Sequence, residues 1–282
     1  MPVEVVDYLR ILPGGVYADV TCGLGGHARL IRDQLSPEGC LVARDRDADS
    51  LDLARPKLET GAGRLIFDEG PFSTLRESLD RLGIPALDGL LADCGVSMYQ
   101  LTSAERGFSI TRPGPLDMRM SRKQELTAAD IVNFSSEREI ADIIVRNSEE
   151  RRWRKLAGAI VRARPIYTTD RLAAVIEKAA APRARRHPAT LVFQALRIAV
   201  NQELDELEAL MRQIPLCIRP GGRATVITFH SLEDRIVKRA FQELERQGKA
   251  SILTRHVVRP TDQETDRNPA ARSAKLRCME MK

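Results

Sequence analysis

The sequence lacks the features that would assign a protein to a membrane or to a secretory route. No run approaches the roughly 20 consecutive apolar residues that span a bilayer. The first residues, Met1 to Glu4, lack the basic and then apolar pattern of a signal peptide. We therefore expect a cytoplasmic protein without a membrane partner.

Cysteine is scarce, and its spacing indicates neither disulfides nor a metal. The chain has five cysteines, an odd number, and none of them forms a C-x-x-C pair. A scattered, odd set argues against a disulfide framework and against a zinc site. We expect reduced thiols and no bound metal. The five residues are Cys22, Cys40, Cys94, Cys217 and Cys278.

Charge is distributed unevenly. Residues 103–205 contain 19 of the 44 lysines and arginines and 13 of the 39 acidic residues, which leaves 25 and 26 elsewhere. A nearly neutral body with one basic segment is typical of a catalytic domain that carries a polyanion-binding surface. Solvated helix faces would give the same counts, so both interpretations stay open at this stage.

Short apolar runs alternate with helical patterns in the first third of the chain, which predicts a parallel α/β sheet. The expected strands are 16–20, 40–43, 64–67 and 87–92, and the expected helices are 27–35 and 50–58. From 103 to 205 the patterns are helical. A capping box at Ser136 to Glu139 begins one helix, and a long helix is expected from Thr190 to Met211.

Strand character returns at 223–229, after the turn Pro220-Gly221-Gly222. The simplest organisation is an α/β domain formed by residues 1–102 and 206–282 and interrupted by a helical substrate-recognition domain at 103–205. No internal repeat or low-complexity tract is present.

A glycine-rich turn follows the first expected strand. Gly23, Gly25 and Gly26 precede a helix, where missing side chains let a nucleotide approach the backbone. Asp45 lies about 20 residues further on, at the end of the second strand, where a carboxylate can accept hydrogen bonds from ribose hydroxyls. A plain turn, a dinucleotide and S-adenosylmethionine are all compatible with this pattern. The ring of His27 disfavours the dinucleotide, because it crowds the phosphate turn.

Two residues are candidates for catalysis. Asp93 closes the fourth expected strand, at the carboxyl edge where α/β sheets bind ligands. Its carboxylate can accept an N–H bond from an amine and orient the nitrogen lone pair. His230 follows the strand 223–229 at the same edge. The structural alternatives are a helix cap at Asp93 and a cap at Ser231 with Asp234 three residues later.

Two groups in the helical region are candidates for contact with a substrate. The first consists of basic residues that would bind phosphates and give salt-dependent affinity. They are Arg151, Arg152, Arg154, Arg183, Arg185 and Arg186. Trp153 either stacks on a base or anchors the core. The second group is the polar segment from Arg106 to Phe108 with Pro115 to Met120, whose composition is too specific for a mere linker.

With these motifs the chain resembles the bacterial ribosomal RNA small subunit methyltransferase H family, over almost its whole length. The most specific matches are Gly25-Gly26-His27, Asp45-Arg46-Asp47, Gly70-Pro71-Phe72-Ser73, Arg106-Gly107-Phe108-Ser109, Pro115 to Met120, His187-Pro188-Ala189-Thr190, Phe193 to Arg197, Phe229 to Lys238, Asn268-Pro269 and Arg272 to Arg277.

This resemblance implies a class I, Rossmann-like methyltransferase fold with an inserted helical domain. It implies transfer of a methyl group from S-adenosylmethionine to N4 of a decoding-site cytidine in 16S rRNA of the small ribosomal subunit. It leaves a homodimer open. The donor contacts it implies are Gly25, Gly26, His27, Asp45, Phe72, Asp93 and Gln100, with Phe72 against the adenine.

Three alternatives remain for comparison. A DNA amino-methyltransferase would carry a Pro-Pro-aromatic signature after the acid of the fourth strand, and Asp93 to Val96 has none. A catalytically silent RNA-binding protein of the same fold would be expected to lose Asp45, Asp93 or the glycines, and all are present. An NAD oxidoreductase would need a hydride-acceptor site, which no motif marks.

Overall fold

The computed structural model describes residues 1–180 and 187–282, and the chain forms two compact units. The first, which we call the sheet unit, contains Met1–Gly95 and Leu204–Lys282. The second, the helical unit, contains Val96–Glu203. Each unit is described by itself.

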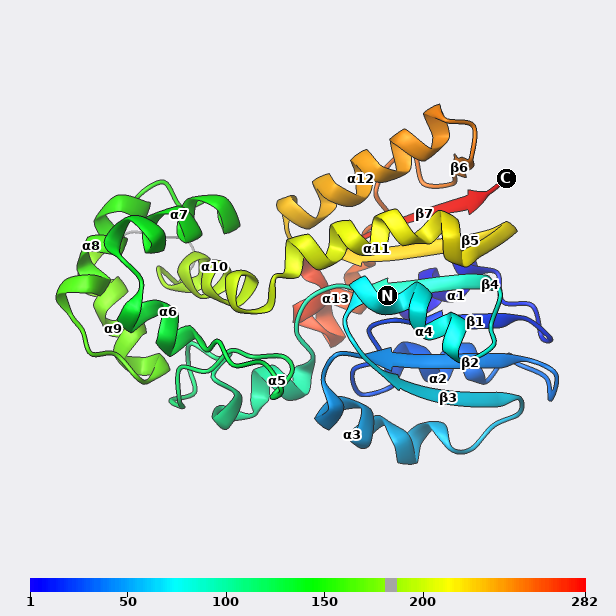
Figure 1. Cartoon of the computed structure of the whole chain (residues 1–282), viewed down its shortest axis with the longest axis horizontal. Helices are drawn as coiled ribbons and strands as arrows, with labels where there is room; N and C mark the ends of the chain where they lie inside the picture. Colours follow the sequence, from blue (N-terminus) through cyan, green and yellow to red (C-terminus); the bar gives the residue numbers. More distant parts are fainter. Residues whose placement is uncertain (181–186) are drawn as a thin grey trace. The chain divides into compact units, whose positions relative to one another are not determined.

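A seven-stranded sheet forms the centre of the sheet unit (Figure 1). Its strands are β1 (Val16–Asp19), β2 (Cys40–Asp45), β3 (Arg64–Glu69), β4 (Leu87–Asp93), β5 (Ile218–Thr228), β6 (Ala250–Ile252) and β7 (Lys275–Met281). Their order is β3-β2-β1-β4-β5-β7-β6. Strands β1 to β5 pair in parallel, and β7 runs antiparallel to both β5 and β6. The four strands expected in the first third are confirmed.

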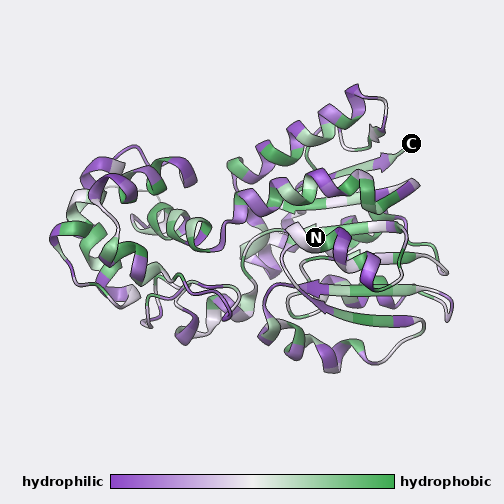
Figure 2. Ribbon diagram, viewed as in Figure 1, coloured by the Kyte–Doolittle hydropathy of each residue, from purple (hydrophilic) through white to green (hydrophobic). Residues whose placement is uncertain are grey.

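Helices cover both faces of this sheet because alternate strand residues point to opposite sides. Ala18 belongs to a core cluster with α4, α11 and α12, whereas its neighbour Tyr17 belongs to a cluster with α1, α2 and α3. The helices of this unit are α1 (Pro2–Leu9), α2 (Gly26–Arg32), α3 (Ala48–Leu58), η1 (Phe72–Thr74), α4 (Leu75–Arg81), α11 (Glu203–Cys217), α12 (Ser231–Arg246), α13 (Asp262–Arg267) and η3 (Pro269–Ser273). Figure 2 shows hydrophobic colour concentrated on the strands, as expected for a sheet covered on both faces.

The helical unit packs short amphipathic helices around a core of its own. They are α5 (Met98–Thr102), η2 (Ala104–Arg106), α6 (Ala128–Phe134), α7 (Glu137–Asn147), α8 (Trp153–Arg162), α9 (Thr169–Ala179) and α10 (Thr190–Asn201). The predicted capping box is confirmed: Ser136 Oγ accepts from the N–H of Glu139, and the Glu139 carboxylate accepts from the N–H of Ser136. Such reciprocal caps satisfy donors that the first turn of a helix leaves without partners.

The single helix expected from Thr190 to Met211 is wrong. Helix α10 ends at Asn201, and α11 begins at Glu203. Gln202 between them has φ 51° and ψ 37°, a left-handed conformation that a right-handed helix does not accommodate. The fully buried Asn201 side chain bonds to the backbone of Met118 and Met120, so tertiary contacts fix this helix end.

Candidate functional site

Three aspartates end three neighbouring parallel strands. Asp19 is the last residue of β1, Asp45 of β2 and Asp93 of β4. Because these strands are adjacent in the order β2-β1-β4, their carboxylates come to one edge of the sheet. Burial raises the pKa of Asp19 to about 7, and the charges of Asp93 and Asp45 add to this rise while His27 opposes it. The edge therefore gathers three carboxyl groups, and a cationic ligand there would favour their ionised forms.

The glycine turn between β1 and α2 adopts backbone conformations that favour glycine. Gly23 has φ 50° and Gly25 has φ 82°. A Cβ on Gly25 would lie 3.3 Å from Ala54 and Leu58 of α3, so this glycine allows close packing of the two helices. A Cβ on Gly26 would meet no atom of the described residues within 4 Å. The space beside Gly26 is the part of the turn that a ligand can approach.

Both oxygens of the Asp45 carboxylate accept backbone hydrogen bonds. Oδ2 accepts from the N–H of Gly23 at 2.8 Å, and Oδ1 accepts from the N–H of Asp47 at 2.9 Å. Burial raises the pKa of Asp45 to about 6, and these hydrogen bonds limit the rise. Each carboxylate oxygen has two acceptor directions, so both can still accept from a ligand hydroxyl. Asp45 is thus oriented to receive a pair of hydroxyls.

His27 and Asp93 meet across the glycine turn. His27 Nε2 lies 3.5 Å from Asp93 Oδ2. Burial disfavours the imidazolium, but Asp93 and Asp19 outweigh it and raise the pKa of His27. His27 Nδ1 and Asp93 Oδ1 are buried and have no hydrogen-bond partner among the residues that the structure describes. Buried polar atoms without partners are costly, and a polar ligand would remove that cost.

Phe72 begins η1, and the residues before it are fixed to the end of β2. The N–H of Gly70 donates to the carbonyl of Asp45 at 2.9 Å. The buried Arg44 side chain donates to the Pro71 carbonyl at 2.8 Å and to Thr74 Oγ1 at 2.6 Å. Arg44 also pairs with the Asp68 carboxylate. The half-buried Phe72 ring is therefore held next to the strand that carries Asp45.

His230 acts as the cap of α12. Its Nδ1 accepts from the N–H of Glu233 at 3.4 Å, and the Glu233 carboxylate accepts from the N–H groups of Phe229 and His230 at 2.8 and 3.3 Å. His230 Nε2 also lies 3.1 Å from a Glu233 carboxylate oxygen. The structural alternative of a cap at Ser231 is thus wrong by one residue. Nδ1 is thus used in starting α12, whereas the buried Nε2 makes no hydrogen bond among the described residues.

Ser97 is the cap of helix α5, so the structural alternative of a cap at Asp93 is wrong. Ser97 Oγ accepts from the N–H of Gln100 at 3.2 Å, and Gln100 Oε1 accepts from the N–H of Ser97 at 3.0 Å. Gln100 is buried within the helical unit. The structure describes it as part of a capping box there.

The predicted basic residues differ in their contacts and exposure. Arg152 makes a two-point ion pair with Glu150, at 3.0 and 3.2 Å. Arg154 is exposed and lies 4.4 Å over the ring of Trp153, which itself packs against the helical core. Arg151 is exposed. Arg183, Arg185 and Arg186 lie outside the described residues.

Sequence reasoning missed Asp19, which is 1% exposed and accepts from both the N–H and the hydroxyl of Thr21. The same hydroxyl accepts from the N–H of Asp93 at 2.6 Å, so Thr21 links β1 to β4 at the site. The strand-end argument used for Asp45 and Asp93 applies equally to Asp19 and could have found it. All five cysteines are buried and free.

Neither a metal cluster nor a membrane helix occurs in the described part of the chain. No group of three or more His, Cys, Asp or Glu side chains there could hold a metal ion. No helix of residues 1–180 and 187–282 is long and apolar enough to cross a bilayer.

The strand order, with antiparallel β7 inserted between β5 and β6, and the carboxylates at the ends of β1, β2 and β4 define a class I, Rossmann-like S-adenosylmethionine-dependent methyltransferase. The predicted fold class is confirmed. More particularly, the chain belongs to the MraW methylase family, which matches residues 1–282.

Similar proteins span nearly the same length. The chain is 49% identical to "Ribosomal RNA small subunit methyltransferase H" of Solibacter usitatus (strain Ellin6076), over 100% of this chain and 98% of the relative. It is 47% identical to the protein of that name in Geobacter sulfurreducens, over 99% and 97%. Among solved structures, an rRNA methylase from Streptococcus thermophilus aligns with a TM-score of 0.46 at 10% identity, covering 100% of this chain and 96% of that one.

The residues of the site fit S-adenosylmethionine, and the prediction of this cofactor is confirmed by the family. A positively charged sulfonium matches the acidic edge formed by Asp19, Asp45 and Asp93, because opposite charges attract strongly where water is excluded. The ribose of the donor matches the hydroxyl-binding geometry of Asp45. The open side of Gly26 leaves space that a Cβ would fill.

Proposed function

We propose that this methyltransferase acts on small-subunit ribosomal RNA, and that its acceptor is the exocyclic N4 of a decoding-site cytidine in 16S rRNA. The observation that carries the proposal is the 49% identity, over the full chain, to a protein named as a ribosomal RNA small subunit methyltransferase. The basic helical segment supports it, since phosphates favour cationic surfaces. Such a substrate places the enzyme in the cytoplasm.

In this proposal the glycine turn and three strand ends hold the donor. Asp45 accepts hydrogen bonds from the ribose hydroxyls, and Gly25, Gly26 and His27 line the donor site beside them. Phe72 packs on the adenine, because its loop is fixed to the carbonyl of Asp45 through Gly70. Gln100 is assigned to the donor on the resemblance alone.

Asp93 is the proposed catalytic residue. When bound, S-adenosylmethionine supplies an electrophilic methyl group on a sulfonium. The amine nitrogen of cytosine is a weak nucleophile, so its lone pair must be aimed at that methyl group. Asp93 Oδ1, which has no hydrogen-bond partner among the described residues, accepts an amine N–H, while Oδ2 is oriented by His27. This hydrogen bond also stabilises the positive charge that develops on nitrogen.

His230 is proposed as a positioning residue, because its Nδ1 accepts from the N–H of Glu233 and caps α12. It would hold the start of α12 at the sheet edge. RNA contacts are proposed for Arg151 and Arg154, which are exposed, and for Arg152. They are also proposed for Arg183, Arg185 and Arg186, which lie outside the described residues.

The test is methyl transfer from labelled S-adenosylmethionine to 30S subunits from a strain that lacks the modification, followed by mapping of the label. We expect one labelled cytidine in the decoding region and none in naked DNA. Label on DNA, on another RNA position or on neither substrate would contradict the proposal. Asp93→Asn is expected to lower kcat at least a hundredfold, since it removes the charge that stabilises the developing positive nitrogen. Donor affinity is expected to fall much less, since the amide keeps an acceptor oxygen and Asp45 still binds the ribose.

A further inference from the structure

The residues that lead from β3 into α4 include Phe72, and they begin a helix whose first turn is capped from a distance. In the part of the chain that the structure describes, neither η1 nor α4 has an N-cap side chain that accepts a hydrogen bond. The first turn of a helix leaves backbone N–H groups without partners, so acceptors must come from elsewhere. Here they come from α11, at positions 133 and 137 residues further along the chain than the N–H groups of Ser73 and Arg76.

Glu206 of α11 holds Ser73 at two points. Its Oε2 accepts from the N–H of Ser73 at 2.8 Å, and its Oε1 accepts from the Ser73 hydroxyl at 2.9 Å. On the other side of Phe72 in the sequence, the Arg44 guanidinium of β2 donates to the Pro71 carbonyl at 2.8 Å. The two residues that flank Phe72 are therefore fixed, one by a strand and one by a helix.

Gln213 lies seven residues after Glu206, on the same face of α11, because seven residues make about two turns of an α-helix. Gln213 Nε2 donates to the Phe72 carbonyl at 2.8 Å. Gln213 Oε1 accepts from the N–H of Arg76 at 2.8 Å. A cap needs only the acceptor, so the bond donated to Phe72 has a separate effect. It fixes the orientation of the peptide that follows the Phe72 side chain.

The helix that carries these two polar side chains is itself fixed by the core of the sheet unit. Apolar residues of α11 are buried in one cluster with apolar residues of α4, and close-packed side chains allow little movement. They are Leu207, Leu210 and Ile214 of α11 and Leu75 and Leu79 of α4. The Phe72 ring packs against the same cluster but is only partly buried, so some of its surface is left for a ligand.

We propose that Glu206 and Gln213 of α11 are positioning residues for the methyl donor, which hold Phe72 where its ring packs on the adenine. This inference rests on the proposed function, because it takes Phe72 to be the adenine contact. A ring that is already held in place loses little conformational freedom when the donor binds. A segment released from α11 would have to be ordered during binding, and the donor would then bind more weakly.

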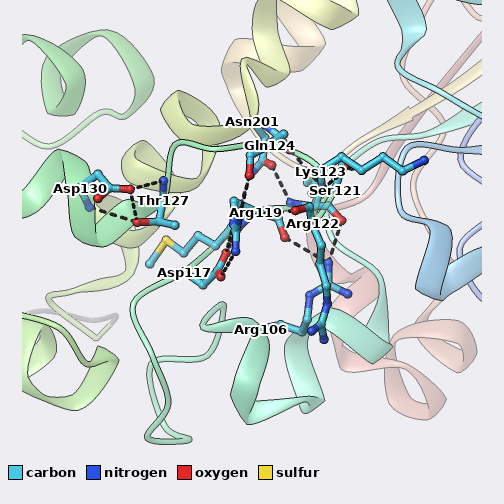
Figure 3. A network of polar contacts seen from close by, with 12 residues as sticks. Arg106, Asp117, Arg119, Ser121, Arg122, Lys123, Gln124, Thr127, Asp130 and Asn201 are labelled. Atoms are coloured by element: carbon cyan, nitrogen blue, oxygen red, sulfur yellow. Dashed lines mark hydrogen bonds and ion pairs between the residues drawn. The ribbon is translucent and has the colours of Figure 1, made fainter.

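The experiment replaces Gln213 by glutamate, which keeps an acceptor oxygen and removes the amide that donates to Phe72. The control is Gln124→Glu, in the polar network of the helical unit that Figure 3 shows. Gln124 Oε1 accepts from the N–H of Ser121 at 3.2 Å, and Gln124 Nε2 donates to the carbonyl of Val200 at 3.0 Å. Both glutamines thus join a backbone N–H to a backbone carbonyl, and the same chemical change is made in the other unit.

Calorimetry measures the Kd for S-adenosylmethionine, and circular dichroism checks that each variant is folded. Loss of the hydrogen bond to Phe72 should raise the Kd of Gln213→Glu by about three- to tenfold. The Kd of Gln124→Glu should stay within about twofold of wild type, because distant changes act independently. With saturating donor, the kcat of Gln213→Glu on 30S subunits should stay within about twofold of wild type, because the change weakens only donor binding.

A Phe72→Ala background decides whether Gln213 acts through the ring. In that background Gln213→Glu should change the Kd by less than about twofold, because no ring remains to be positioned. An equal rise of the Kd in both backgrounds would overturn the inference, and so would a wild-type Kd in the single variant.

Glu206 provides a second pair of variants, which tests the inference even where Gln213→Glu does not fold. Glu206→Gln keeps an oxygen for the N–H of Ser73 and an amide for its hydroxyl, so donor affinity should be retained. Glu206→Ala loses both contacts and should bind the donor about three- to tenfold more weakly. Equal affinity of these two variants would overturn the role of Glu206. A Phe72→Ala enzyme that binds the donor as tightly as the wild type would instead overturn the adenine assignment in the proposed function.

Discussion

Replacing Asp45 by alanine tests the donor site most directly. The carboxylate would lose two hydrogen bonds from ribose hydroxyls, each worth about 1.5 kcal/mol at the low end of the range for a charged acceptor. The sum of about 3 kcal/mol corresponds to roughly a hundredfold rise in the Kd for S-adenosylmethionine.

The same change has a small expected effect on stability. It leaves the N–H groups of Gly23 and Asp47 without their acceptor, which costs about 1 kcal/mol each. It also removes a carboxylate that burial already destabilises, as its pKa of about 6 indicates. These effects oppose each other, so the unfolding free energy should change by no more than about 2 kcal/mol.

Isothermal titration calorimetry with S-adenosylmethionine measures the binding, and urea unfolding followed by circular dichroism measures the stability. Asp52→Ala on α3 is the control, because that aspartate is 77% exposed. A Kd for Asp45→Ala within threefold of wild type, in a protein that unfolds normally, would refute the ribose assignment.

Three further predictions concern the glycine turn between β1 and α2, the pH dependence of donor affinity and the end of α10. Gly26→Ala should fold with an unfolding free energy within about 1 kcal/mol of wild type but bind the donor more than tenfold more weakly. Gly25→Ala should lose about 1 to 2 kcal/mol of unfolding free energy because its φ is positive. Calorimetry measures the binding and urea unfolding the stability, and equal behaviour of the two variants would contradict the turn geometry. Donor affinity should fall as the pH falls through about 6, because a protonated Asp45 is a poorer hydrogen-bond acceptor. Asp45→Asn should lose this part of the pH profile. An identical pH profile in the variant would show that another group titrates. Asn201→Ala should lower the unfolding free energy by about 2 kcal/mol, since it leaves the buried N–H of Met120 without an acceptor. An unchanged urea midpoint would count against this role of Asn201.

The sheet could be predicted where local pattern and tertiary position agree. Strands β1, β2 and β4 are apolar runs between glycine turns, so their burial is visible in the sequence, whereas the edge strand β3 is only partly buried. Asp45 and Asp93 were identifiable for a related reason, because ligands of parallel sheets bind at carboxyl ends of strands. Asp19 satisfies the same condition and needed only the same argument.

Strand β7 could not be predicted from local pattern because its charges are neutralised by distant partners. Arg277 and Lys275 pair with Asp234 of α12, at 2.7 and 3.3 Å, and Glu280 pairs with Arg223 of β5 at 2.9 Å. Without those partners, charged residues in a strand between β5 and β6 would be unfavourable. The helix break at Gln202 has a similar origin, since it depends on contacts with a segment about 80 residues earlier.

The insertion of the helical unit between β4 and β5 also has a consequence for folding during synthesis. Leu87 to Ala92 of β4 are all buried, and this strand needs β5 as its second neighbour. The register pairs Asp93 with Ile227, so the ribosome must add the entire helical unit before the partner emerges. At translation rates of roughly 5 to 20 residues per second, β4 presents an open apolar edge for on the order of ten seconds. The nascent chain is then exposed to chaperone binding and to mispairing, while the contiguous helical unit can complete its own core.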